Sequence, residues 1–109
     1  SSKLCSNHSK RSLTPRHLLE LICAHYELSM DDLIGKSRER RFALPRQIAM
    51  YLLREELKCS FPTIGDHLGS RDHTTAMHAC EKIHELVKSD DRMKRDVAHL
   101  REKMYSSSG

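Results

Sequence analysis

The sequence predicts an all-α fold, a compact helical bundle of about six helices. Three observations support this: apolar residues recur at three- and four-residue spacing, capping residues and prolines stand at the expected helix starts, and no segment shows a strand-like alternation. The 109 residues suit one domain, and 38% hydrophobic residues allow a modest aliphatic core. We expect residues 14–105 to form this domain, between a flexible N-terminal linker (1–13) and a flexible tail (106–109).

The first two predicted helices are identified by their ends. Thr14 is suited to an N-cap and Pro15 to the first helical position. The apolar stripe that follows consists of Leu18, Leu19, Ile22, Cys23 and Tyr26. A short second helix is predicted after Ser29, which forms a capping-box pattern with Asp32, and Gly35 closes it.

Two longer helices are predicted from apolar periodicity. One starts at Pro45, and its stripe, expected to lie at the centre of the core, is Ile48, Ala49, Leu52, Leu53 and Leu57. The last helix is predicted to be capped by Ser89, and its stripe is Met93, Val97, Leu100 and Met104. We expect this last stripe to pack on the first helix. The alternative is that it docks a partner helix, which would make the chain a protein-interaction module.

The segment between residues 60 and 87 has the spacing of a helix-turn-helix. Ser60 and Pro62 begin a short helix, Gly69 ends it in a left-handed conformation, and Asp72 is the N-cap of a longer helix. The packing residues expected on that helix are Ala76, Met77, Ala79, Cys80, Ile83 and Val87. A short helix, a tight glycine turn and a longer helix are typical of proteins that read double-stranded DNA.

The first residues of the longer helix have side chains suited to base recognition. In a helix-turn-helix this end of the second helix faces base edges in the major groove. The residues there are Asp72, His73, Thr74 and Thr75, which offer a carboxylate for a cytosine amino group, an imidazole donor, and hydroxyls with methyls for thymine. The spacing of Arg71, His78 and Lys82 suits phosphate contacts. The alternative is that Asp72 is only a cap and the threonines are ordinary first-turn residues.

The net charge of +4 is concentrated in residues 36–46. This segment holds five basic residues and one acidic residue, whereas residues 1–35 and 47–109 are each neutral. A flexible arginine loop can enter a minor groove narrowed at A·T runs. Arg46 and Gln47 stand at the predicted start of a helix, where backbone amides favour a phosphate. The alternative is a solvated surface loop.

Catalysis has little support in the sequence. Gly35, Lys36 and Ser37 resemble the end of a phosphate-binding loop, but Met30 stands where that motif has glycine. Neither a Ser/His/Asp group nor paired carboxylates in an apolar setting stands out, so we expect no enzyme in this chain.

Metal and membrane sites are likewise not expected. Cys80 and His84 are one helical turn apart, but their surroundings lack the compact ligand set of a metal site. The four cysteines show no paired spacing, which fits a reducing cytosol. Because no apolar run approaches the ~20 residues needed to cross a bilayer, we expect a soluble, intracellular protein.

Two stretches resemble the C-terminal DNA-binding domain of the bacterial replication initiator family, DnaA. They are LPRQIAMYLLREEL and IGDHLGSRDHTTAMHACEKI, and the resemblance extends over residues 14–104. It implies an all-helical domain with a Trp-repressor-like helix-turn-helix that binds A·T-rich boxes of double-stranded DNA at the replication origin. It also implies a monomeric domain without a cofactor, with ATP expected only for an upstream module, and a cytoplasmic, nucleoid-associated protein with no membrane insertion.

The resemblance also implies roles for individual residues. Those expected to read bases are Arg38, Asp72, His73, Thr74 and Thr75, with Arg38 in the minor groove and Arg40 as the alternative there. Those expected to contact or flank the sugar-phosphate backbone are Arg46, Gln47, Arg54, Pro62, Arg71, His78 and Lys82. Two positions depart from the family pattern: Ser70 replaces a frequent second glycine, and His67 a frequent phenylalanine.

A further alternative keeps the helix-turn-helix but changes its context. The chain would then be a regulator or a transposase-associated protein that borrowed an initiator-type domain. Gene context would separate this alternative from the initiator.

Overall fold

The structure is a computed structural model, which describes residues 14–35, 40–69 and 72–106. In these ranges it contains six α-helices and no β-strand, so the predicted all-α bundle is confirmed. The helices are α2 (Pro15–Tyr26), α3 (Met30–Ile34), α4 (Arg40–Glu56), α5 (Phe61–His67), α6 (His73–Ser89) and α7 (Asp91–Ser106). The linker predicted at 1–13 lies outside the described residues, and α7 extends to the first residue of the predicted tail.

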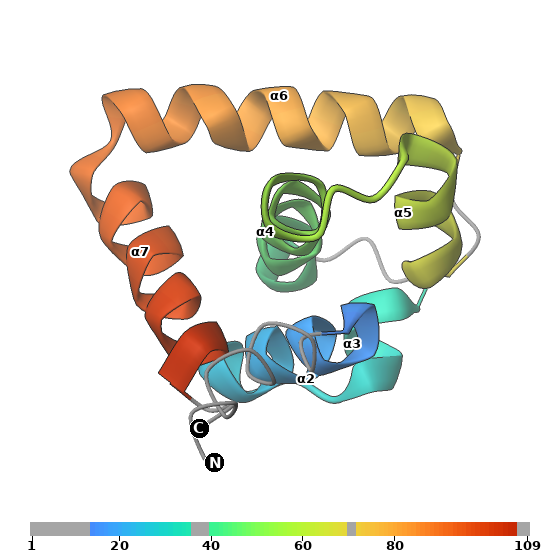
Figure 1. Cartoon of the computed structure of the whole chain (residues 1–109), viewed down its shortest axis with the longest axis horizontal. Helices are drawn as coiled ribbons and strands as arrows, with labels where there is room; N and C mark the ends of the chain where they lie inside the picture. Colours follow the sequence, from blue (N-terminus) through green and yellow to red (C-terminus); the bar gives the residue numbers. More distant parts are fainter. Residues whose placement is uncertain (1–13, 36–39, 70–71, 107–109) are drawn as a thin grey trace, which may run out of the picture.

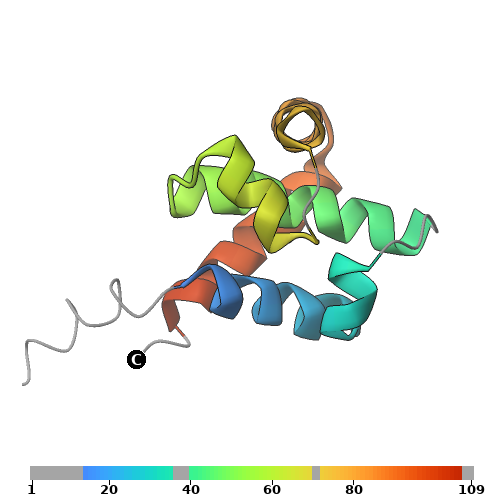
Figure 2. The same ribbon diagram turned by 90° about the vertical axis from the view of Figure 1, so that its right-hand side faces the viewer.

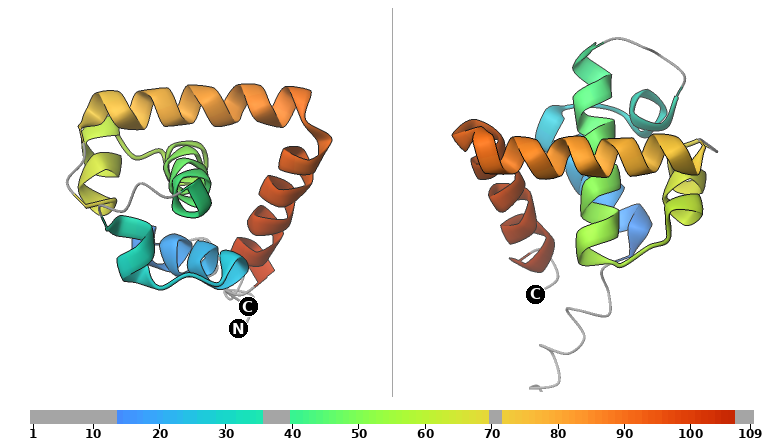
Figure 3. Two further views of the ribbon diagram at one scale, coloured as in Figure 1. Left: turned by 180° about the vertical axis from the view of Figure 1, so that it is seen from behind. Right: turned by 90° about the horizontal axis from the view of Figure 1, so that it is seen from above.

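Helix α4 is the centre of the bundle. In Figure 1 it is seen almost end-on, surrounded by α6, α7, α2 with α3, and α5. Figure 2 shows α6 on one side of α4 and α2 on the other. In the view from above, on the right of Figure 3, α6 crosses α4. Helix α4 therefore lies between α6 and α2.

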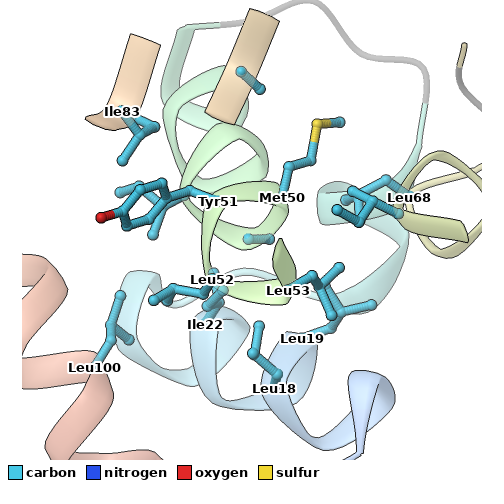
Figure 4. Packing of buried hydrophobic residues seen from close by; sticks show 14 of the residues in the cluster. Leu18, Leu19, Ile22, Met50, Tyr51, Leu52, Leu53, Leu68, Ile83 and Leu100 are labelled. Carbon is cyan, nitrogen blue, oxygen red and sulfur yellow. The ribbon is translucent and has the colours of Figure 1, made fainter. Parts of the chain in front are cut away.

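The core is aliphatic and is built around α4. Leu52 and Leu53 are fully buried and point toward α2, where Ile22 and Leu19 meet them (Figure 4). Tyr51 lies on the other side, toward Ile83 of α6. Helix α4 is thus the centre of the core, as predicted, and buried Met50 and Tyr51 extend its buried surface beyond the predicted stripe.

The caps predicted for three helices are confirmed. The Thr14 hydroxyl accepts from the His17 amide at 3.1 Å. Ser29 and Asp32 form the expected reciprocal capping box at the start of α3. The Ser60 hydroxyl accepts from the Thr63 amide at 3.4 Å, with Pro62 in the first turn of α5. These short polar residues satisfy amides that a helix start leaves without partners.

The predicted start of the third helix at Pro45 is wrong, because α4 begins five residues earlier, at Arg40. Pro45 therefore lies inside the helix, where it has no amide hydrogen to donate. The extra turn buries Phe42, which is 5% exposed, and the Arg41 guanidinium lies 4.8 Å from its ring centroid. The predicted flexible segment 36–46 is thus helical from residue 40 onward.

The predicted cap of the last helix is also wrong by one residue. The Ser89 hydroxyl donates to the Glu85 carbonyl at 3.0 Å, so it is bonded back onto α6. The cap of α7 is Asp90, whose carboxylate accepts from the Arg92 amide at 2.9 Å and whose carbonyl accepts from the Lys94 amide at 3.0 Å. Both residue types are suitable caps, and the path of the chain between the two helices decides between them.

Helix α7 is fixed to the bundle by its apolar stripe. Met93, Val97, Leu100 and Met104 are all buried, as expected for packing within the domain. At its far end Arg101 forms an ion pair with Glu56 of α4 at 2.8 Å, and the Tyr105 hydroxyl donates to the same carboxylate. Since the stripe is covered, it is not available to dock a partner helix.

Candidate nucleic-acid interface

Helices α5 and α6 pack together as the predicted helix-turn-helix. Ile64 and Leu68 are fully buried, as is Ala76 at the start of α6. Gly69, between the helices, has φ +88°, which only glycine adopts without strain. Short helix, glycine turn and long helix are confirmed in the described part of the chain.

The start of α6 presents the four predicted reading residues to solvent. Asp72, His73, Thr74 and Thr75 are all exposed. Asp72 occupies the N-cap position, and its carbonyl accepts from the amides of Thr75 at 3.1 Å and Ala76 at 3.3 Å. Its carboxylate forms no capping hydrogen bond. The Asp72 side chain therefore does not cap α6 in this structure, and base reading by this carboxylate stays a prediction.

The face that α6 turns to the core differs from the prediction at one residue. Ala76, Ala79, Cys80 and Ile83 are buried as predicted. Met77 was predicted to pack, but it is 37% exposed, because at 100° per residue it falls outside the stripe formed by these four. An apolar side chain is thus exposed one turn after His73.

A groove of about 290 Å³ lies between α4 and α6 and brings together predicted residues that are distant in the sequence. Its lining includes Arg46 and Gln47 from α4 and Thr75, His78 and Lys82 from α6. Ala43, Met50 and Ala79 complete it with apolar surface. These three were not among the predicted site residues, since small or apolar side chains in a helix indicate packing until a neighbouring helix is known.

A buried hydrogen bond connects the two helices that form this groove. The Cys80 thiol of α6 donates to the Met50 carbonyl of α4 at 3.5 Å. Burial raises the pKa of Cys80 to about 11, so this thiol is protonated at neutral pH. Cys80 is therefore a packing residue at the contact between α6 and α4.

The Arg46 side chain is more deeply buried than a side chain that only contacts phosphate needs to be. It is 7% exposed, and its Nε donates to the Leu33 carbonyl at 2.6 Å. One terminal nitrogen, Nη2, donates to the Asp32 carbonyl at 3.0 Å. The guanidinium thus links α4 to the end of α3, while its role toward the DNA backbone stays a prediction.

Arg54 and Pro62 are found together, outside the lining of this groove. Arg54 is exposed, and its Nη1 donates to the Cys59 carbonyl at 3.0 Å. The guanidinium also lies 4.6 Å from the centroid of the Phe61 ring, next to the exposed Pro62. Arg54 therefore stabilises the connection between α4 and α5 and still presents a positive charge beside the helix-turn-helix.

Several predicted positions cannot be placed in this interface. Arg38, Ser70 and Arg71 lie outside the described residues, as does the side chain of Arg40. Among the residues that are described, no group of three or more His, Cys, Asp or Glu side chains is arranged to hold a metal ion. None of the described helices is long and apolar enough to span a membrane.

Comparison with known proteins decides the family. Residues 15–83, which run from the start of α2 through most of α6, match the family model of the bacterial DnaA protein helix-turn-helix. The chain belongs to the bacterial DnaA family. The DnaA match includes both walls of the α4–α6 groove and the helix-turn-helix as far as residue 83 of α6.

Curated DnaA relatives extend the match over most of the chain. The chromosomal replication initiator protein DnaA of Thermomicrobium roseum is 44% identical over 99 residues, covering 91% of this chain and 21% of the relative. The protein of the same name from Chloroflexus aurantiacus is 41% identical over 106 residues, covering 97% and 22%. That from Lactobacillus delbrueckii subsp. bulgaricus is 45% identical over 92 residues, covering 84% and 20%. The chain thus spans about a fifth of the length of these DnaA proteins.

Proposed function

We propose that this DnaA-family domain binds double-stranded DNA sequence-specifically, at A·T-rich boxes of a bacterial replication origin. The observation that carries the proposal is the exposed start of α6, where Asp72 to Thr75 stand at the end of a helix-turn-helix. The names of the relatives, all chromosomal replication initiators, point to the origin as the place of binding.

The proposed mechanism divides sequence reading from affinity. The first turn of α6 enters the major groove, where Asp72, His73, Thr74 and Thr75 meet base edges. The segment that contains Arg38 adds A·T preference in the adjacent minor groove. Phosphate contacts from cations such as Lys82 supply salt-dependent affinity and fix the register on the duplex.

The α4–α6 groove supports the backbone part of this mechanism. Lys82 and His78 line it on one helix and Gln47 on the other, so donors from two helices converge. A deoxyribose-phosphate unit has an apolar sugar face and an anionic phosphate. The groove combines apolar lining from Ala43, Met50 and Ala79 with polar side chains, which matches that combination.

The other functions considered for the sequence are not favoured. The α7 stripe that a protein-interaction module would need is buried. The curated relatives named above are initiators, not regulators or transposase-associated proteins. We propose that the domain acts as a monomer on nucleoid DNA and needs no cofactor, and that ATP belongs to another module of the parent protein.

A fluorescence-anisotropy titration tests the proposal. The domain is titrated against a duplex that carries the family's origin box and against a shuffled duplex, each at two salt concentrations. We expect the box to bind at least ~10³ times more tightly near physiological salt. Equal binding of both duplexes, with both affinities collapsing at higher salt, would show that only non-specific charge contacts act and would refute sequence-specific recognition.

A further inference from the structure

The last three carbonyl groups of α3 face two other parts of the fold: α4 and the turn before α6. Arg46 of α4 donates to those of Asp32 and Leu33. The carbonyl of Ile34 lies so close to Gly69 that a Cβ there would stand 2.4 Å from its oxygen. The turn that precedes α6 therefore rests on the same end of α3 that Arg46 holds.

This end of α3 needs an outside donor. The helix has five residues and no basic residue in its last turn. The final carbonyls of a helix have no partner within it, and arginine is suited to satisfy them. The planar guanidinium reaches two carbonyls at once from Nε and Nη2, which a lysine ammonium at the end of a flexible chain does not reproduce.

Burial separates Arg46 from the other cations around the groove. It is 7% exposed, whereas Lys82 is exposed. A guanidinium enclosed in this way and bonded to backbone oxygens fixes local geometry. A cation that acts by releasing counterions from phosphates must instead reach the duplex.

We infer that Arg46 is a positioning residue for α6: it holds the end of α3 beneath Gly69 and so sets the angle at which α6 meets DNA. The inference rests on the proposed function. A positioning role for Arg46 and a phosphate contact by Arg46 have different effects on DNA binding. Phosphate contacts strengthen binding to every sequence, whereas the angle of α6 matters for hydrogen bonds to base edges.

The test compares Arg46→Met and Arg46→Lys with the native chain, on the box and shuffled duplexes, over a series of salt concentrations. Arg46→Met removes all donors, whereas Arg46→Lys keeps the charge and the reach into the site. Lys82→Ala is the matched control for an exposed cation of the same groove. All proteins are assayed where their circular dichroism spectra match that of the native chain.

We expect both Arg46 variants to lower the box-to-shuffled affinity ratio about tenfold, comparable to the effect of one mismatched base pair, with the salt dependence of binding unchanged. In Lys82→Ala the ratio should persist while the salt dependence falls. Arg46→Lys retains a charge for phosphate, so recovery of the native ratio in that variant would overturn the inference.

Two other results would also overturn the positioning role. Equal weakening on both duplexes with reduced salt dependence would assign Arg46 to a phosphate contact. Equal weakening with unchanged salt dependence would mean that Arg46 supports binding without affecting the contacts to base edges. The native chain distinguishes these from failure of the proposed function: if it does not discriminate the two duplexes, sequence-specific binding itself is refuted and the inference is withdrawn with it.

Discussion

The carbonyl oxygen of Ile34 lies directly against Gly69, 2.4 Å from where a Cβ at residue 69 would stand. Gly69 also has φ +88°. Two independent reasons, backbone conformation and lack of space, therefore require glycine in the turn before α6.

Gly69→Ala is expected to destabilise the domain, with about 1–3 kcal/mol from backbone strain alone and more from the contact with Ile34. Urea denaturation measures this change. Gly69→Asn is the informative comparison, because asparagine tolerates a positive φ better than alanine but carries the same Cβ. Asparagine should therefore be less costly than alanine and still worse than glycine. A Gly69→Ala protein as stable as the native chain would contradict the close approach.

Thr75 connects the reading end of α6 with the groove, since it is exposed in the first turn and also lines the groove. Thr75→Ala should lose roughly 1–3 kcal/mol of discrimination at one or two base pairs of the box. Anisotropy titrations against duplexes with single base-pair changes locate those pairs. Thr75→Ser keeps the hydroxyl and isolates the methyl contribution. Equal loss on box and shuffled DNA would remove Thr75 from the reading residues.

Lys82 is exposed on α6, one turn beyond His78 in the groove lining. Lys82→Ala should weaken binding to all sequences alike and lower the slope of log Kd against log salt by about 1, as expected for one lost phosphate contact. Lys88, exposed at the far end of the same helix and outside the groove lining, provides the control. If Lys88→Ala changes the slope as much as Lys82→Ala, the effect reflects overall charge and not the groove.

The helix ends that could be predicted from the sequence depend on local interactions. Thr14, Ser29 and Ser60 each bond to an amide three residues later, and such contacts can be read from spacing. The early start of α4 could not be read in this way. Pro45 is a strong local signal for a helix start, but burial of Phe42 by the rest of the fold outweighs the one lost hydrogen bond.

The sequence predicts those features of the candidate site that depend on neighbouring residues, but not those that depend on how the helices pack. The four residues at the start of α6 follow from capping and helix-turn-helix spacing. The contact of Arg46 with Leu33 spans 13 residues and depends on how α3 packs against α4, so no periodicity reveals it. The apolar lining from Ala43 and Met50 likewise becomes part of a site only because α6 crosses α4 there.

Leu100 tests whether α7 is an integral part of the domain. It is fully buried in the stripe that faces the core. Leu100→Ala should lower the free energy of unfolding by about 2–5 kcal/mol, because it removes buried methyl groups and leaves a cavity. Ala98, exposed on the opposite side of α7, can be changed to serine as a control with little effect. A negligible cost for Leu100→Ala, together with self-association in light scattering, would contradict the buried packing of α7.

We expect the stability of the domain to depend on pH through His25 of α2, which lies beside Lys103 of α7. Burial, and then the charge of Lys103, whose Nζ lies 3.4 Å from Nδ1, lower the pKa of His25 below its ordinary value of 6.5, although Asp96 acts in the opposite direction. Below pH 6.5 the unfolded chain therefore binds a proton that the folded protein does not, so the free energy of unfolding should fall as the pH decreases from 6.5 toward the folded pKa.

Urea denaturation between pH 7.5 and about 5 measures this change, because this window includes the ordinary histidine range. His25→Asn should flatten the dependence, whereas His84→Asn, an exposed change on α6, should not. Identical pH profiles for the native chain and His25→Asn would show that His25 does not couple protonation to folding.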